Sequence, residues 1–177
     1  MKSLKKIVIT GPESSGKTTL AQALATQFQT EWVPEFAREY LNKIKGEYDE
    51  NDLVKIAKGQ LQSENKIAKT AQNNLLLCDT DLMTIEIWSI YKYNHCNEFI
   101  TQKVKTRHYN LYLLCAPDIP WTPDPLREHP TQRLQIFNIY QARLEALNKP
   151  YQIITGTPQN RLSQAIKTIQ AINQIGY

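Results

Sequence analysis

The feature that most constrains this chain is the segment of residues 11–18, Gly-Pro-Glu-Ser-Ser-Gly-Lys-Thr. The segment follows Ile7-Val8-Ile9, a β-branched apolar run typical of a buried strand. It precedes residues 19–28, in which apolar side chains recur at helical spacing. A Gly-x4-Gly-Lys-Thr pattern between a strand and a helix is typical of a phosphate-binding loop, because its backbone N–H groups and the helix start surround phosphate oxygens. The sequence therefore predicts a strand, an anion-binding turn and a helix, in that order.

This loop is the predicted nucleotide site. Lys17 is expected to reach the β- and γ-phosphates of ATP as a point charge, and the Thr18 hydroxyl is expected to ligate Mg²⁺. ATP and Mg²⁺ are therefore the predicted cofactors. The predicted nucleotide-binding residues are Gly11, Glu13, Ser14, Ser15, Gly16, Lys17, Thr18 and Thr19. A glycine- and serine-rich turn that binds no ligand is the alternative for this segment.

Strand-like and helical segments alternate along the rest of the chain. Strands are predicted near residues 5–10, 30–33, 75–78, 110–115 and 151–155. Helices are predicted over residues 17–28, from Pro34, over 55–71, from Asp81 through Trp88, over 98–105, from Thr131 with Leu134 inward, and from Pro158. This alternation predicts an α/β fold in three layers, α/β/α, with a parallel sheet that binds ligands beyond the carboxyl ends of its strands.

Length and composition indicate a single globular domain over residues 1–177. Of the 177 residues, 41% are hydrophobic and 21% are charged, with no biased tract. The net charge of +4 is spread along the chain without a basic block, so nucleic acid is not an expected partner. No apolar run is long enough for a membrane span, and the 3 cysteines have no Cys-x-x-Cys spacing. We therefore expect a cytoplasmic protein without a membrane partner or zinc, and the sequence leaves its oligomeric state unknown.

Residues 117–133 form an unusual segment, because five of the chain's 9 prolines lie between Pro117 and Pro130. Proline is excluded from helix interiors and central strands, so we predict an ordered loop or a lid. A lid would exclude water and bring Arg127 to the transferring phosphoryl group. Trp121 would either stack on a ligand ring or hold the loop in place. A rigid surface loop with an exposed arginine is the alternative.

Two aspartates follow the apolar run of residues 75–78. Asp79 has the position of an aspartate held at a strand end near a metal ion, with a turn residue as the alternative. In an extended Asp79-Thr80-Asp81 the two carboxylates would share a side of the chain. Asp81 would then contact substrate or metal, but it could equally be only a helix N-cap.

Glu35 and Arg38 lie just after the second predicted strand. If a helix begins at Pro34, the two side chains share one face of it. Glu35 could then accept the proton of an attacking hydroxyl, and Arg38 could orient the substrate or the transferring phosphoryl group. A surface ion pair at a helix start is the alternative.

Four separated motifs together resemble one family. They are Gly11-x-Glu13-Ser14-Ser15-Gly16-Lys17, Glu35-Phe36-x-Arg38-Glu39-Tyr40, Cys78-Asp79-Thr80-Asp81 and Trp121-x-x-Asp124-x-x-Arg127. In this order they are similar to the ribosylnicotinamide kinase domain of NadR-type proteins. The resemblance implies a P-loop nucleoside and nucleotide kinase fold with a five-stranded parallel sheet and a lid. It also implies that the γ-phosphoryl group of ATP is transferred to the 5′-hydroxyl of nicotinamide riboside, which gives nicotinamide mononucleotide in NAD salvage.

The resemblance assigns roles outside the phosphate loop as well. It suggests that Glu35, Arg38, Asp79 and Asp81 surround the ribose and the metal. It also places Trp121 to Arg127 on the substrate side of the lid. The predicted substrate-binding residues are Glu35, Arg38, Asp79, Asp81, Trp121 and Asp124, and the predicted metal ligands are Thr18 and Asp79. The predicted catalytic residues are Lys17, Glu35, Asp81 and Arg127. The general base stays open between Glu35, Asp79 and Asp81.

The chain departs from that family in its expected domains, and other functions stand as alternatives. Many NadR-type proteins carry an adenylyltransferase domain before the kinase, some with a DNA-binding domain, and neither is expected here. A step from mononucleotide to NAD would therefore need another protein. Another nucleoside, nucleotide or small-hydroxyl kinase is one alternative, and an ATPase switch that binds a partner and phosphorylates nothing is another. A GTPase is disfavoured because Asn148-Lys149-Pro150-Tyr151 lacks the aspartate that reads guanine.

Overall fold

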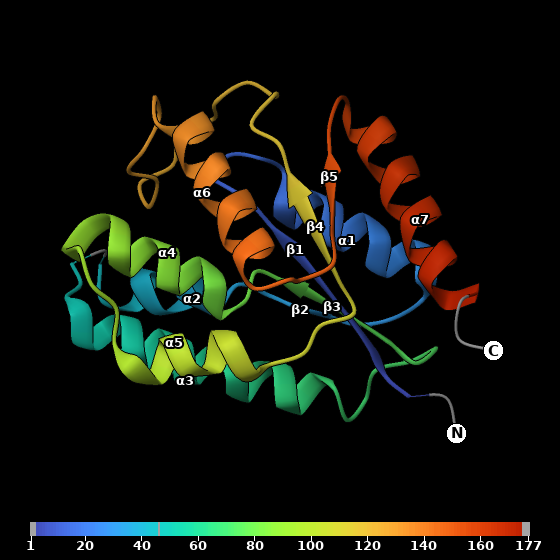
Figure 1. Ribbon diagram of the computed structural model, residues 1–177, viewed down its shortest axis with the longest axis horizontal. Coiled ribbons are helices and arrows are strands. Elements are labelled where there is room, and N and C mark those ends of the chain that lie inside the picture. The colour runs from blue at the N-terminus through green and yellow to red at the C-terminus, as the bar shows by residue number, and fades with distance from the viewer. Residues whose placement is uncertain (1–2, 46, 175–177) are drawn as a thin grey trace.

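The centre of the protein is a sheet of five parallel strands in the order β2-β3-β1-β4-β5 (Figure 1). A computed structural model describes residues 3–45 and 47–174 of the chain. The strands are β1 (Lys5–Thr10), β2 (Trp32–Val33), β3 (Leu75–Asp79), β4 (Leu111–Cys115) and β5 (Tyr151–Ile154). The predicted α/β fold with a five-stranded parallel sheet is therefore confirmed.

Helices cover both faces of the sheet and complete the three layers. α1 (Lys17–Phe28) and α7 (Pro158–Gln174) pack on one face (Figure 1). The opposite face carries α2 (Phe36–Lys43), α3 (Glu50–Ile67), α4 (Leu82–Tyr93), α5 (Glu98–Thr106) and α6 (Arg133–Ala146). Among the helices of the described residues, none combines the length and the apolar character that crossing a membrane requires.

Both layers of helices pack against β1. Ile7 and Ile9 contact the core that contains α1 and α7, whereas Val8 contacts the core of the opposite face, because side chains alternate along a strand. All three side chains are fully buried, which explains their continuous apolar run. Burial of a side chain of this size contributes about 1.5–3 kcal/mol. Burial on both faces therefore fixes the position of β1, from which the phosphate loop continues.

The central place of β1 determines where a ligand can bind. β1 pairs with β3 on one side and with β4 on the other, and Ile9 is in register with Asp79. The chain leaves β1 for a helix on one face of the sheet and leaves β3 for a helix on the other face. In open parallel sheets, ligands bind at the carboxyl ends of strands where the chain diverges in this way.

The start of α2 differs from the prediction. The helix begins at Phe36 with Glu35 as its extended N-cap, so the predicted first helical position of Pro34 is wrong. The Phe36 N–H donates to Gln60 Oε1 at 2.8 Å, and Gln60 Nε2 donates to the Pro34 carbonyl oxygen at 3.4 Å. A buried glutamine from α3 therefore sets this boundary, and no local pattern indicates it.

The predicted bounds of the next helix, 55–71, are wrong at both ends. α3 begins at Glu50 because a capping box stabilises its first turn. The Asp49 carboxylate accepts the N–H groups of Asn51 and Asp52, and the Asp52 carboxylate accepts the Asp49 N–H at 3.0 Å. An aspartate replaces the usual glutamate of this motif.

Residues 117–132, called the proline-rich loop from here on, contain neither helix nor strand. α6 then begins at Arg133, two residues after its predicted start at Thr131. The predicted inward position of Leu134 is wrong, because that side chain is 65% exposed. The buried stripe of α6 starts at Ile136 and continues through Phe137 instead.

Candidate active site

The phosphate loop is a tight turn between β1 and α1. Gly11 has φ +136°, and a Cβ at this position would lie 2.6 Å from the last carbonyl oxygen of β4. Gly16 caps α1 in a left-handed conformation with φ 78°. The Pro12 carbonyl oxygen accepts hydrogen bonds from Ser15 Oγ at 2.7 Å and from Lys17 Nζ at 2.8 Å. Glycine at both ends and bonds within the turn therefore give the loop its shape and hold the Lys17 ammonium against it.

Thr18 and Asp79 form the predicted metal pair. Thr18 Oγ1 donates to Asp79 Oδ2 at 2.5 Å, whereas Asp79 Oδ1 is buried without a hydrogen-bond partner among the described residues. Burial, and then the charge of Glu35, raises the pKa of Asp79 from 3.8 to about 6. An unpartnered buried carboxylate oxygen beside a hydroxyl fits Mg²⁺, which prefers oxygen ligands and takes others from water and phosphates.

Asp81 lies apart from this pair. Thr80 has φ 69°, so the chain turns there, and the predicted extended segment with two carboxylates on one side is wrong. Asp81 Oδ1 accepts the Met83 N–H at 3.2 Å, and Oδ2 accepts the Tyr112 hydroxyl at 2.9 Å. Burial raises the pKa of Asp81 to about 7. Neither Asp79 nor Asp81 lines the cavity described next, but both carboxylate oxygens of Asp81 are hydrogen-bonded, which favours the N-cap alternative over a catalytic Asp81.

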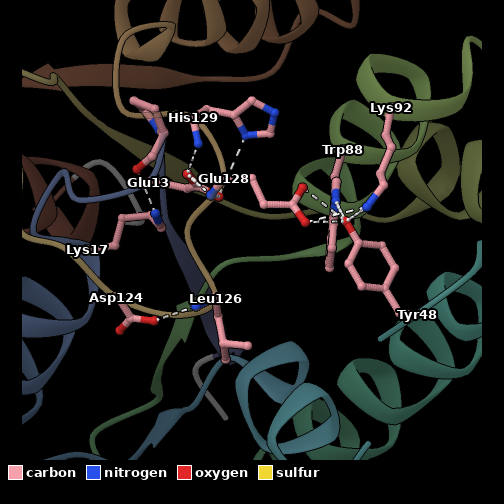
Figure 2. A network of polar contacts seen from close by, with 10 residues as sticks. Glu13, Lys17, Tyr48, Trp88, Lys92, Asp124, Leu126, Glu128 and His129 are labelled. Atoms are coloured by element: carbon pink, nitrogen blue, oxygen red, sulfur yellow. Dashed lines mark hydrogen bonds and ion pairs between the residues drawn. The ribbon is translucent and has the colours of Figure 1, made fainter. Parts of the chain in front are cut away.

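A cavity opens beside the phosphate loop. All the predicted nucleotide-binding residues line it on one side. Residues of α2, α4, α6, the loop before α3 and the proline-rich loop line the rest. Figure 2 shows Glu13 and Lys17 on one side of this region and Tyr48 and Trp88 on the other. The cavity therefore joins a phosphate-binding wall to a second wall of different chemistry.

The proline-rich loop is tied to the phosphate-binding wall. The Glu13 carboxylate accepts the N–H groups of Glu128 at 3.0 Å and of His129 at 2.9 Å (Figure 2). Ser14 Oγ accepts the Thr122 N–H at 2.9 Å. Side chains at the centre of the phosphate loop thus hold the backbone of the proline-rich loop.

Glu35 and Arg38 both line the cavity, as their place after β2 predicts. The Glu35 side chain makes no capping hydrogen bond at the start of α2, which leaves its carboxylate facing the cavity unbonded to that helix. Arg38 Nη1 donates to Asp124 Oδ2 at 2.9 Å. A hydrogen bond from the Leu126 N–H, with the contact to Arg38, holds the pKa of Asp124 below its usual value. Asp124 itself does not line the cavity and instead positions Arg38.

Arg127 lines the cavity, but Trp121 does not. The guanidinium carbons of Arg127 and Arg133 lie 5.9 Å and 5.8 Å from the centre of the Trp121 ring. Arg127 also donates to the Thr122 carbonyl oxygen. Trp121 therefore contacts Arg127 of the proline-rich loop and Arg133 at the start of α6 through cation–π interactions, which favours the pinning alternative over a ligand-stacking Trp121.

The aromatic residues of the second wall were not predicted as site residues from the sequence, and they include Tyr48, Trp88 and Tyr91. The Tyr48 hydroxyl accepts hydrogen bonds from Trp88 Nε1 at 2.7 Å and Lys92 Nζ at 2.6 Å, and it donates to the Glu128 carboxylate at 3.2 Å (Figure 2). The spacing of Trp88 and Tyr91 could have indicated part of this wall, because residues three apart share one face of a helix. Tyr48 reaches the wall only through tertiary packing.

Comparison with known proteins places the chain in a family. Residues 6–161 match the model of a family described as an AAA domain, AAA_28. The curated protein "Trifunctional NAD biosynthesis/regulator protein NadR" of Escherichia coli strain K12 is 30% identical over 130 residues. The match covers 70% of this chain and 31% of that protein, so the chain spans about a third of its curated relative. The resemblance to NadR-type proteins is confirmed.

Two solved structures share the fold. A crystal structure of NadR protein in complex with NR has a TM-score of 0.76 at 18% identity, covering 95% of this chain and 51% of that one. Thymidylate kinase from Ehrlichia chaffeensis has a TM-score of 0.70 at 15% identity, covering 95% of this chain and 100% of that one. These two structures confirm the predicted fold, and the predicted P-loop phosphotransferase agrees with the family match and with the curated relative.

Proposed function

The chain belongs to the AAA-domain family whose model matches residues 6–161, and from this premise we propose that it is an ATP-dependent kinase of nicotinamide riboside. The reaction would transfer the γ-phosphoryl group to the riboside 5′-hydroxyl and yield nicotinamide mononucleotide. The observation that carries the proposal is a cavity that joins the phosphate loop to a wall containing a carboxylate, a guanidinium and aromatic rings. Such a cavity suits a nucleotide beside a nucleoside.

The donor side would be held by the phosphate loop. Lys17 reaches the β- and γ-phosphates as a point charge, and the backbone N–H groups of the loop bind phosphate oxygens. Thr18 and Asp79 would hold Mg²⁺, which supplies positive charge to the phosphate oxygens when bound. Positioning and electrostatic stabilisation supply most of the catalysis in phosphoryl transfer.

Glu35 is the proposed general base. It lines the cavity, and its charge is close enough to Asp79 to raise the pKa of that carboxyl. The Asp79 carboxylate accepts a hydrogen bond from Thr18, and the Asp81 carboxylate caps α4. Of the three candidate bases, Glu35 is therefore the one that lines the cavity in which the acceptor would bind. Arg38, fixed by Asp124, would orient the acceptor.

The proline-rich loop would act as a lid that delivers Arg127 to the transferring phosphoryl group. Glu13 and Ser14 hold the loop on the donor side, and Asp124 holds it to Arg38 on the acceptor side. One loop therefore contacts both walls, which suits a segment that excludes water once both ligands are bound.

The acceptor ring would lie against the aromatic wall of Tyr48, Trp88 and Tyr91. An aromatic face attracts a planar ring, and more strongly one that carries positive charge, as the pyridinium of nicotinamide riboside does. NR is also the ligand named with the NadR protein structure. A kinase for another nucleoside or nucleotide is the second candidate, because the thymidylate kinase shares the fold over the whole of its chain.

The test is ADP release by the purified protein with ATP and Mg²⁺ against a panel of acceptors. The panel contains nicotinamide riboside, nicotinic acid riboside, purine and pyrimidine nucleosides, deoxynucleoside monophosphates and shikimate. We expect the highest kcat/KM with nicotinamide riboside. A higher value with another acceptor would replace the proposed substrate, and ADP release that no acceptor stimulates would favour the ATPase switch.

A further inference from the structure

A buried arginine in the first turn of α7 joins three loops at the nucleotide side of the sheet. Arg161 is 3% exposed, and its Nε donates to the Gly156 carbonyl oxygen at 2.7 Å. Nη1 donates to the Ser15 carbonyl oxygen at 2.9 Å, and Nη2 donates to the Ala116 carbonyl oxygen at 2.9 Å. Ser15 belongs to the phosphate loop, Ala116 follows β4 and Gly156 follows β5. One guanidinium therefore bridges the loops that follow three different strands.

Asp118 completes this cluster. Its Oδ1 forms an ion pair with Arg161 Nη2, and its Oδ2 accepts the Gly156 N–H at 2.6 Å. Asp118 lies near the start of the proline-rich loop. The cluster thus fixes the phosphate loop relative to the start of the proline-rich loop, which carries Arg127.

Arg161 occupies a position where a cation is unfavourable. The first turn of a helix carries the positive end of the macrodipole, and burial removes the guanidinium from water. The three carbonyl oxygens and one carboxylate offset these effects. Replacing a buried ion pair by apolar residues is often neutral or stabilising, so stability alone does not explain an arginine here.

The orientation of the peptide group between Ser15 and Gly16 gives a better explanation for an arginine at this position. The Ser15 carbonyl and the Gly16 N–H belong to the same planar trans peptide, so they point in opposite directions. Because the carbonyl points to Arg161, the Gly16 N–H points away from it. We propose that Arg161 is a positioning residue that orients this N–H, and the loop around it, for binding the phosphates of ATP.

The proposal depends on nucleotide binding by the phosphate loop and not on the identity of the acceptor. It is therefore tested by equilibrium binding of ATP with Mg²⁺ in the absence of any acceptor. An error in the nicotinamide riboside assignment leaves this measurement unaffected.

The decisive variants are Arg161→Lys and its matched control Arg143→Lys. Arg143 makes a bidentate pair with the buried Glu86, at 2.8 Å for each bond, and it does not line the cavity. Both changes keep a charge beside a carboxylate and lose the fork of donors. We expect Arg161→Lys to raise the Kd for ATP about tenfold, because hydrogen bonds that hold the loop are lost. Arg143→Lys should lower the Tm and leave that Kd unchanged.

Steady-state kinetics supply a second readout. Arg161→Lys should raise the KM for ATP and leave the KM for the acceptor unchanged, whereas a purely structural residue would show only a lower Tm. An unchanged Kd for ATP, or an equal rise in Arg143→Lys, would overturn the proposal. If Arg161→Lys fails to fold, Asp118→Asn carries the test, since it keeps an acceptor for the Gly156 N–H and removes the charge. An unchanged Kd in that variant would equally overturn the proposal.

Discussion

The two walls of the cavity are built in opposite ways. The phosphate-binding wall is one run of residues, 11–18, held between β1 and α1 by its own hydrogen bonds. The second wall takes its side chains from α2, α4, α6, the loop before α3 and the proline-rich loop. Contacts such as Arg38–Asp124 and Tyr48–Glu128 hold those segments together. In the proposed reaction, donor binding would thus depend on local backbone geometry, whereas acceptor binding would depend on the packing of segments far apart in the sequence.

This difference predicts separable effects of substitution. Changes in the phosphate loop should remove ATP binding or turnover whatever the acceptor is. Changes in the second wall should alter the KM for the acceptor and leave the Kd for ATP intact. The following experiments test that separation, from the largest expected effect to the smallest.

Lys17→Ala should have the largest effect, because it removes the ammonium that would reach the transferring phosphoryl group in the proposed reaction. We expect kcat/KM to fall about a thousandfold while the circular dichroism spectrum stays unchanged. The matched control is Lys43→Ala, since Lys43 is an exposed lysine paired with Glu39 on the surface of α2. Turnover of Lys17→Ala comparable to that of the control would contradict the assignment of the donor wall.

Asp79→Asn and Asp81→Asn form a matched pair that separates the two aspartates. Asp79→Asn should lower kcat/KM about a hundredfold by weakening the Mg²⁺ site. Asp81→Asn should leave turnover nearly unchanged, because an amide oxygen can still accept the Met83 N–H. Equal losses in both variants would restore the catalytic Asp81 that the sequence predicts.

Trp88→Ala should affect the second wall alone. We expect the KM for the acceptor to rise about tenfold from lost stacking, with the Kd for ATP unchanged. Trp88→Phe keeps a ring and should recover part of the loss. A changed Kd for ATP in Trp88→Ala would break the proposed separation of the two walls.

The smallest effects concern pH. Because the pKa of Asp81 is raised to about 7, the folded state binds a proton more tightly than the unfolded state. The contribution of Asp81 to the free energy of unfolding therefore falls as the pH rises from about 4 to 7. Asp81→Asn removes that loss. Urea unfolding should therefore show the variant gaining stability relative to the wild type between pH 4.5 and pH 8, by up to about a few kcal/mol. A pH-independent difference would show that Asp81 titrates normally.

The same reasoning applies to function at Asp79. Its carboxylate must be ionised to bind Mg²⁺, and its pKa is raised to about 6. The affinity for Mg²⁺ should therefore fall as the pH drops below about 6. Calorimetric titration of Mg²⁺ with ATP present, at pH 5.5 and pH 7.5, measures this directly.

The contrast between the walls also explains what the sequence could reveal. The strand before the phosphate loop, the two glycines and Lys17 lie within a dozen residues, and local pattern predicts all of them. Asp79 was also predictable, because it ends an apolar strand in register with β1.

The remaining parts of the site depend on contacts that local pattern does not report. The turn at Thr80 separates Asp81 from Asp79, and Gln60 moves the start of α2 past Pro34. Tyr48 reaches the cavity, and Arg161 reaches the phosphate loop, through packing against segments distant in the sequence. Such residues become visible only when the fold is known.

The central claim is that the two walls act together to pass a phosphoryl group from ATP to a nucleoside. Its most direct test is to incubate the protein with ATP, Mg²⁺ and nicotinamide riboside and to follow ADP and nicotinamide mononucleotide by mass spectrometry. The two products should accumulate at equal rates, and Lys17→Ala should lower both rates about a thousandfold. ADP formation without the mononucleotide would contradict the claim.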